Sequence, residues 1–195
     1  MTAPDQNALL EDLVSGDDDR AEAAALALGQ RGDGALPALR QMLSHPNVDT
    51  RWWATRAIGE IGSDAAIPAL IDRCADLDPD VRACAIYALG RAGPRAIDAV
   101  PVLAQRLADT HAHTAQLAAD ALARIGKATT PSLVDALKHG APPVRGRAAR
   151  ALAQILDPSS IPALIASLED ESPIVEYYAD IALQKMGVGS ILLKV

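Results

Sequence analysis

The four histidines are the first candidates for chemistry, because imidazole binds metals and transfers protons near neutral pH. They are His45, His111, His113 and His139. Their positions predict helix ends or connections, and none is expected to form an i, i+4 pair with a carboxylate partner that would suggest a metal site. We therefore expect no metal centre, and we interpret His111 and His113 as solvated side chains.

The cysteines, glycines and acidic residues give no catalytic motif either. Cys74 and Cys84 lack the spacing of a metal-binding or redox motif, and we expect Cys74 to be a buried thiol rather than a reactive one. No G-x-S-x-G, P-loop or dinucleotide-binding glycine pattern occurs. The consecutive acids at residues 17–19 are interpreted as favourable charges at a helix start. The sequence thus predicts neither catalysis nor a cofactor.

The net charge of −7 is unevenly distributed along the 195 residues. Residues 81–155 contain ten Lys or Arg and four Asp or Glu, whereas residues 157–184 contain six acids and no Lys or Arg. Two interpretations stay open: a soluble surface, or a basic region that meets an anionic patch of a partner. Without an 18-residue apolar run or a signal-peptide pattern, we expect a cytoplasmic protein that does not enter the membrane.

A pattern recurs six times and predicts the elements that carry these residues. It is anchored at positions spaced by 30, 31, 33, 30 and 31 residues, namely Gly32, Gly62, Gly93, Gly126, Leu156 and Gly187. Alanine stands eight and five residues before every anchor, and Leu or Ile stands four before it. These offsets place the alanines and leucines on one face of a helix, so each repeat is expected to contain an Ala-rich helix.

Start signals flank the Ala-rich helices, and a second type of helix connects them. Four helix starts carry an N-capping residue, namely Asp17, Asn47, Asp78 and Ser172. The connecting helices contain an early proline followed by leucines on a buried stripe, at Pro37, Pro68, Pro101, Pro131 and Pro162. Pairing each connecting helix with the next Ala-rich helix predicts an all-α array of about six helix pairs, or about twelve helices.

The array is expected to be one continuous repeat domain over residues 1–195, because each repeat packs only on its neighbours. Residues 1–16 are predicted to form an N-terminal capping helix and residues 17–187 the repeats. Residues 188–195 either cover the last apolar face or attach to a partner, and both alternatives stay open.

The pattern V-R-x-x-A-x-x-A-L-G-x-I-G, followed by a proline-containing helix, resembles the HEAT-repeat proteins of the short-repeat, phycobilisome-lyase-like class. The match is specific at Arg51, Arg82 and Arg145, and weaker in the three other repeats. The resemblance implies a right-handed, armadillo/HEAT-like α-solenoid. It also implies a structural ladder of polar contacts between repeats, in which Asp49 accompanies Arg51 and Asp80 accompanies Arg82.

In that family the Ala-rich helices line a concave surface, and the x positions of the pattern face outward. In this chain the x positions hold every aromatic side chain and three arginines: Trp52, Trp53, Tyr87, Tyr177 and Tyr178, with Arg56, Arg147 and Arg150. Any single aromatic could instead pack locally against the next repeat. As a set, exposed Trp, Tyr and Arg are the residue types that dominate binding hot spots, so we expect a concave recognition face for a protein partner.

Three other functions are alternatives to a scaffold that binds a protein partner. Bilin lyases give the repeat class its name, and a lyase-type subunit or chaperone that handles a tetrapyrrole is the alternative. Deoxyhypusine hydroxylases resemble the fold but bind iron through His-Glu pairs, and this chain has no His-Glu dipeptide. Nucleic-acid binding is less favoured, because the pI is near 5.0 and no dense basic track runs along the array. We therefore predict a non-catalytic protein-interaction scaffold.

Overall fold

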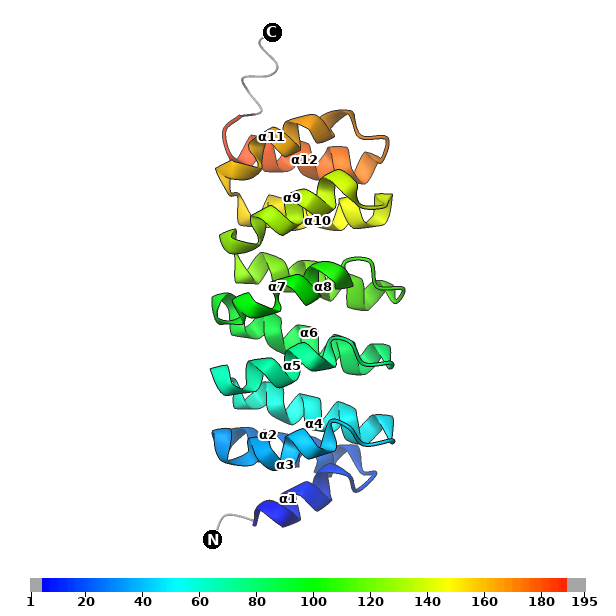
Figure 1. Ribbon diagram of the computed structural model, residues 1–195, viewed down its shortest axis with the longest axis vertical. Coiled ribbons are helices and arrows are strands. Elements are labelled where there is room, and N and C mark those ends of the chain that lie inside the picture. The colour runs from blue at the N-terminus through cyan, green and yellow to red at the C-terminus, as the bar shows by residue number, and fades with distance from the viewer. Residues whose placement is uncertain (1–4, 189–195) are drawn as a thin grey trace. The chain divides into compact units, whose positions relative to one another are not determined.

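The computed structural model describes residues 5–188, and all regular structure in that range is helical. The helices group into two compact units, residues 1–92 and residues 93–195, which are described separately. The predicted all-α repeat fold is confirmed, with α1 to α12 forming pairs of a connecting helix and an Ala-rich helix (Figure 1). The predicted C-terminal cap or tail lies, apart from Val188, outside the described residues.

The first unit contains three helix pairs in which each Ala-rich helix packs on the next. Its elements are α1 (Gln6–Leu13), α2 (Asp18–Gln30), η1 (Gly32–Ala35), α3 (Leu36–Met42), α4 (Val48–Ile61), η2 (Asp64–Ala66), α5 (Ile67–Arg73) and α6 (Pro79–Ala92). The Ala-rich helix α4 contacts α2 on one side and α6 on the other. The connecting helices α1, α3 and α5 pack on the Ala-rich helices that follow them.

The second unit repeats this arrangement. Its elements are η3 (Gly93–Ala99), α7 (Val100–Arg106), α8 (Ala112–Ile125), η4 (Lys127–Thr129), α9 (Thr130–His139), α10 (Pro142–Ile155), η5 (Pro158–Ser160), α11 (Ile161–Ala166), η6 (Ser167–Glu169) and α12 (Pro173–Lys185). The Ala-rich helix α10 contacts both α8 and α12. The connecting helices α7, α9 and α11 pack on α8, α10 and α12 respectively.

Small side chains let neighbouring Ala-rich helices approach closely. The alanine eight residues before each anchor is buried in every repeat, at Ala24, Ala54, Ala85, Ala118, Ala148 and Ala179. At Gly29 of α2, an added Cβ would lie 2.5 Å from the Cβ of Glu60 in α4, a distance that two carbon atoms cannot adopt. The core is therefore an Ala and Leu interior whose backbones are held close together.

Most of the predicted N-caps are present. The carboxylate or amide oxygens of Asp17, Asn47 and Asp78 each accept a hydrogen bond from the backbone N–H three residues on, at 3.0, 3.1 and 3.2 Å. The prediction for Ser172 is wrong, because its side chain makes no capping bond. Its backbone N–H instead donates to Oδ1 of Asp170 at 2.9 Å, so the loop before α12 is held by the acid two residues earlier.

The repeat anchors all adopt a positive φ angle, which ends each Ala-rich segment. Gly62 has φ +65° and terminates α4, and Leu156 is the only non-glycine residue with positive φ within residues 5–188. A positive φ angle is unfavourable for residues that have a Cβ, which explains why glycine occupies the anchor in the other repeats.

Substituting Gly62→Ala should destabilise the fold by about 1–2 kcal/mol, because alanine must adopt the left-handed conformation. The matched control is Gly34→Ala, where φ is not positive and an added Cβ meets no atom within 4 Å. Urea denaturation followed by circular dichroism compares the two variants. Equal midpoints would contradict the assigned role of the anchor backbone.

Arginines at the start of Ala-rich helices bridge to the loop of the following pair. Nε and Nη2 of Arg51 in α4 donate to Oδ2 and Oδ1 of Asp76, both at 2.9 Å. Nε and Nη2 of Arg145 in α10 donate in the same way to Asp170, both at 2.8 Å. Arg51 thus makes a contact between repeats, and the carboxylate that it binds is not Asp49 but Asp76, 25 residues further on.

Arg82, the third arginine of the predicted ladder, lies in α6 and is buried. Its Nη1 donates to the backbone carbonyls of Asp76 and Leu77, at 2.9 and 3.0 Å. Asp80, its expected partner, is exposed, and its backbone N–H donates to the cap Asp78 at 2.9 Å. Asp49 and Asp80 therefore occupy first-turn positions of α4 and α6, where their charge complements the helix dipole.

The carboxylate of Asp76 is the most heavily bonded acid in the first unit. Besides Arg51, it accepts from Nη1 of Arg73 at 3.2 Å and from the backbone N–H of Asp78 at 3.0 Å. Burial opposes its ionisation, but the Arg51 guanidinium and the Asp78 N–H outweigh burial, so the pKa of Asp76 lies below its ordinary value. Ionised Asp76 therefore stabilises the fold at every pH above the ordinary pKa of an aspartate. This stabilisation is lost as the pH falls through the lowered pKa of Asp76.

Asp76→Asn should lower the free energy of unfolding at pH 7 by about 3 kcal/mol, because it leaves the poorly exposed Arg51 without a charge partner. The difference from wild type should shrink as the pH falls below the ordinary aspartate pKa and through the lowered pKa of Asp76, because the wild type then loses the same charge. Asp72→Asn, an exposed acid in the same segment, is the control. A stability difference that does not vary with pH would contradict the role of the ionised pair.

Candidate binding face of the Ala-rich helices

The x positions of the repeat do not all face outward. The third x position is buried in five of the six repeats, at Ala25, Thr55, Ile86, Ala119 and Ala149. In α4 and α10, which each contact two other Ala-rich helices and a connecting helix, the neighbours cover a wide arc that includes this position. In α12 the equivalent Asp180 is exposed. The outward surface is therefore narrower than the sequence pattern suggested. It consists of the first, second and fourth x positions, except Ala83 and Gly146, which are buried.

We call these outward positions the Ala-rich face, and all eight predicted partner-binding residues lie on it. In the first unit it includes Trp52, Trp53, Arg56 and Tyr87, and in the second unit Arg147, Arg150, Tyr177 and Tyr178. Tyr87 and Tyr177 are 51% and 60% exposed, whereas the other six are half-buried. The structure thus separates two freely exposed tyrosines from side chains that already pack against their neighbours.

The two tryptophans pack against each other and line a pocket in the first unit. Their ring centroids are 4.6 Å apart and the rings are nearly perpendicular. The pocket has a volume of about 600 Å³ and lies between the end of α1 and the starts of α2 and α4. Leu13 and Val14 supply apolar lining, and Asp18 and Asp49 supply carboxylates. It combines aromatic surface with negative charge.

Arg56 is already engaged by acids of its own unit. Its Nη2 lies 2.8 Å from Oε1 of Glu22 in α2, and its Nη1 contacts Oε1 of Glu60 one turn along α4. Nη1 of Arg91 in α6 lies 2.5 Å from the same Glu60 oxygen. Burial opposes ionisation of Glu60, but Arg91 and Arg56 outweigh it and hold the pKa of this carboxyl below its ordinary value. Arg56 therefore joins α4 to α2 and has little unpaired charge, and the shared Glu60 extends this network to α6 through Arg91.

The arginines of the second unit differ in their partners. Nη2 of Arg150 lies 3.0 Å from Oδ1 of Asp120 in α8, and Gln116 also donates to that oxygen at 3.2 Å. Nη1 of Arg147 donates to the backbone carbonyl of Leu107 at 3.0 Å. Arg150 is neutralised by a carboxylate, whereas Arg147 contacts only a neutral group among the described residues.

A second pocket lies on the Ala-rich face of the second unit, over α8, α10 and α12. Its volume is about 450 Å³. Pro142, Pro143 and Ile174 give it an apolar side, and Arg147, Arg150 and Tyr178 give it a polar side. Tyr178 packs edge-on against Tyr177, with ring centroids 5.2 Å apart. The two units therefore offer pockets of different charge.

Several residues of the face were missed by the sequence analysis, although the repeat spacing contains the signal. Glu60 and Arg91 occupy the same place in successive repeats, as do Asp120 and Arg150. Opposite charges one repeat apart lie side by side when their helices pack, so aligning the repeats and searching each column for opposite charges predicts both pairs. Asp18 and Asp49 line the pocket because the end of α1 lies beside the start of α4. An alignment of the repeats carries no information on this contact.

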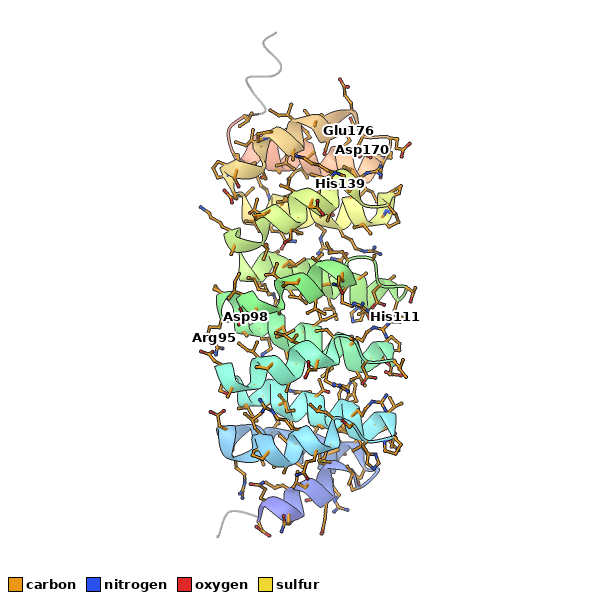
Figure 2. All side chains as sticks on the ribbon, viewed as in Figure 1. Arg95, Asp98, His111, His139, Asp170 and Glu176 are labelled. Carbon is orange, nitrogen blue, oxygen red and sulfur yellow. The ribbon has the colours of Figure 1, made fainter. Side chains whose placement is uncertain are left out.

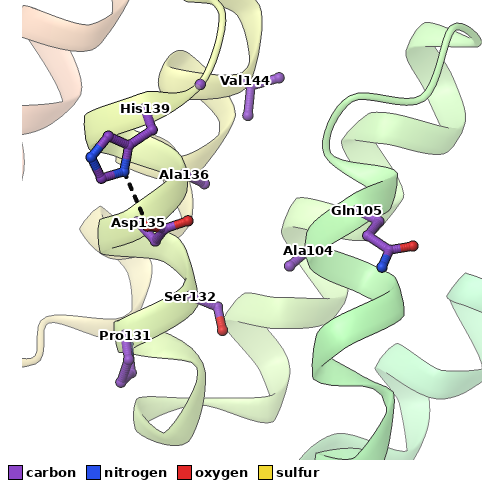
Figure 3. A pocket seen from close by; sticks show the side chains of 9 residues that line it. Ala104, Gln105, Pro131, Ser132, Asp135, Ala136, His139 and Val144 are labelled. Carbon is purple, nitrogen blue, oxygen red and sulfur yellow. Dashed lines mark hydrogen bonds and ion pairs between the residues drawn. The ribbon is translucent and has the colours of Figure 1, made fainter.

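His139 corrects one expectation, because it does form an i, i+4 pair with a carboxylate. Its Nδ1 lies 3.0 Å from Oδ1 of Asp135 on α9, and both side chains are about three-quarters exposed. The pair borders a pocket between α7 and α9. Ser132 also lines this pocket, and its side chain points away from the imidazole of His139 (Figure 3). No hydrogen bond joins Ser132 to His139, so this group lacks the geometry of an activated serine.

The other titratable candidates lie apart from one another. His111 lies in the loop before α8, and Asp170 lies in the loop before α12 (Figure 2). Burial raises the pKa of the Cys84 thiol to about 12, and Cys74 is fully buried, so neither is a nucleophile at neutral pH. Within residues 5–188, no three His, Cys, Asp or Glu side chains gather as a metal site. No helix in this range has the length and apolar character to cross a membrane.

Comparison with known proteins places this geometry in a structural context. No curated protein matches the sequence. Among solved structures, an engineered protein is 26% identical, with a TM-score of 0.56 over 94% of this chain and 98% of its own. A designed armadillo repeat protein in complex with a (KR)4 peptide is 20% identical, with a TM-score of 0.57 over 94% and 100% of the two chains.

The complex of CpcE and CpcF of phycocyanin lyase from Nostoc sp. PCC7120 is also similar in fold. It is 23% identical, with a TM-score of 0.55 over 96% of this chain and 79% of its own. The family model for HEAT repeats matches residues 7–90, 71–141 and 130–190, which together span nearly all of the sequence. The chain therefore belongs to the family of HEAT-repeat proteins.

Proposed function

We propose that this protein is a non-catalytic scaffold that binds a protein partner on the Ala-rich face. The observation that supports the proposal is that every aromatic side chain stands at an x position of an Ala-rich helix in its own unit, and none is fully buried. Tyr87 and Tyr177 are more than half exposed, although the Ala and Leu core needs no aromatic group to fill it. Large exposed aromatics beside arginine are typical of protein-binding hot spots.

Charge supports a protein partner over a nucleic acid. The first unit, residues 1–92, contains eight Lys or Arg and fifteen Asp or Glu, and the second contains ten of each. A phosphate backbone requires a continuous row of unpaired cations. On the Ala-rich face, Arg56 and Arg150 are already bound to carboxylates. This arrangement of charges suits a protein partner, whose surface combines apolar and charged groups.

The bilin-lyase alternative rests on likeness of fold to the lyase complex, and fold does not determine activity. The four histidines and two cysteines of this chain form no constellation that would assign a chemical step. We therefore favour the scaffold function. The experiment described next also detects a coloured ligand such as a bilin.

Substituting Tyr87→Ala and Tyr177→Ala together should reduce capture of the partner from the source lysate at least about tenfold, because two exposed anchors are lost. Melting should change little, since neither side chain is buried. The measurement is affinity capture with quantitative mass spectrometry, together with visible absorbance of the eluate.

The matched control removes apolar side chains elsewhere, with Ile97→Ala and Ile165→Ala, which are 43% and 38% exposed. The control should capture the partner as the wild type does. If the control loses the partner and the tyrosine variant keeps it, the proposed face is wrong. A coloured eluate would favour the lyase-type alternative, and salt-sensitive capture of DNA or RNA would favour nucleic-acid binding.

A further inference from the structure

We infer that the pocket beside Trp52 and Trp53 binds a cationic side chain, a lysine or arginine in an exposed segment of the protein partner. The inference rests on the proposed function, because it assigns the chemistry that one part of the Ala-rich face recognises. It is carried by the aromatic surface of the pocket, by its two carboxylates and by the charge of the first unit.

The pocket has the size and lining for a long side chain. Its volume of about 600 Å³ exceeds the space that one Lys or Arg side chain with adjoining backbone needs to enter. Both indole rings line it, and their edge-to-face contact at 4.6 Å fixes their relative orientation. Trp is the aromatic residue that attracts cations most strongly, through the negative face of its ring. Val14, which is 47% exposed, offers apolar surface to an aliphatic stem.

The two carboxylates that line the pocket have no cationic partner in the described chain. Asp18 and Asp49 lie in the first turns of α2 and α4, and both are exposed. Neither side chain forms an ion pair with a residue between 5 and 188. Two unpaired carboxylates beside aromatic faces are suited to a guanidinium or ammonium group, which donates to oxygen and lies against the rings.

The basic residues nearest in sequence are already bound elsewhere. Arg20 of α2 pairs with Asp12, and Arg51 of α4 pairs with Asp76. No Lys, Arg or His belongs to the described lining. The negative charge of the pocket is therefore available to an external cation, and the acidic excess of the first unit should steer such a cation toward it.

The second pocket makes the assignment specific. Its charged lining consists of Arg147 and Arg150, with no carboxylate among the described lining residues, so it would repel a cation. Of these two pockets, the tryptophan pocket is therefore the one suited to a basic peptide.

Intrinsic fluorescence tests the inference directly, because both tryptophans of the chain line this pocket. The full chain is titrated with an end-capped (Lys-Gly)4 peptide, with (Arg-Gly)4, and with (Glu-Gly)4 as the opposite charge. We expect the basic peptides to change the tryptophan emission saturably and the acidic peptide to have no effect. Raising the salt concentration should weaken the response.

Asp18→Asn with Asp49→Asn should weaken binding of the basic peptides about tenfold or more, because it removes both carboxylates at nearly constant shape. The matched control is Asp19→Asn with Asp80→Asn, which removes two acids from first turns of α2 and α6 that do not line the pocket. The control has the same net charge as the test variant, so it should bind nearly as the wild type does. Circular dichroism verifies the helical content of each variant.

Equal affinity of the two double variants would overturn the inference, as would an equal response to basic and acidic peptides. A basic peptide that leaves the emission unchanged at millimolar concentration would overturn it as well. None of these results would contradict partner binding on the Ala-rich face, which the tyrosine variant tests separately. If the tyrosine variant loses the partner while the Asp18/Asp49 variant captures it fully, the face binds the partner but not through a cation in this pocket.

Discussion

Neighbouring Ala-rich helices in each unit pack through Ala and Gly, and this close approach is the constraint on which the other features depend. At Gly29 there is no room for a Cβ next to Glu60. Because small residues and leucines fill the interior, aromatic side chains are not needed there. Close helices also bring equivalent positions of successive repeats together, so charges such as Glu60 and Arg91 meet across helices. One packing rule thus produces both the core and the pattern of the outward face.

The bonded loop acids explain how this packing is held in register. Asp76 and Asp170 each bind an arginine of the preceding Ala-rich helix and a backbone N–H of their own loop. Such a contact fixes the start of one helix relative to the previous helix pair. The residues of the Ala-rich face follow within one to three turns of these starts. The polar links therefore position the outward side chains while remaining outside the Ala-rich face.

The sequence predicted the helices well because one period repeats six times, and each repeat reinforces the same boundaries. It predicted the partners of side chains less well. The family resemblance named Asp49 with Arg51 as parts of a polar ladder, but the acid that Arg51 binds is Asp76, in the loop of the following helix pair. Ser172 has the residue type of a cap, but Asp170 satisfies the same loop. Thr55 and Ile86 are buried, although both stand at x positions of the repeat pattern. Each of these depends on packing between elements.

The most direct test of the proposed binding face is hydroxyl-radical footprinting of the chain, free and bound to the captured partner. Tryptophan and tyrosine oxidise readily, and all five such residues lie on the Ala-rich face, whereas Met42 lies on the connecting helix α3. We expect partner binding to lower oxidation of Trp52, Tyr87 and Tyr177 and to leave oxidation of Met42 unchanged. Protection of Met42 with unaltered oxidation of the aromatics would contradict the proposed binding face and place the partner on the connecting helices.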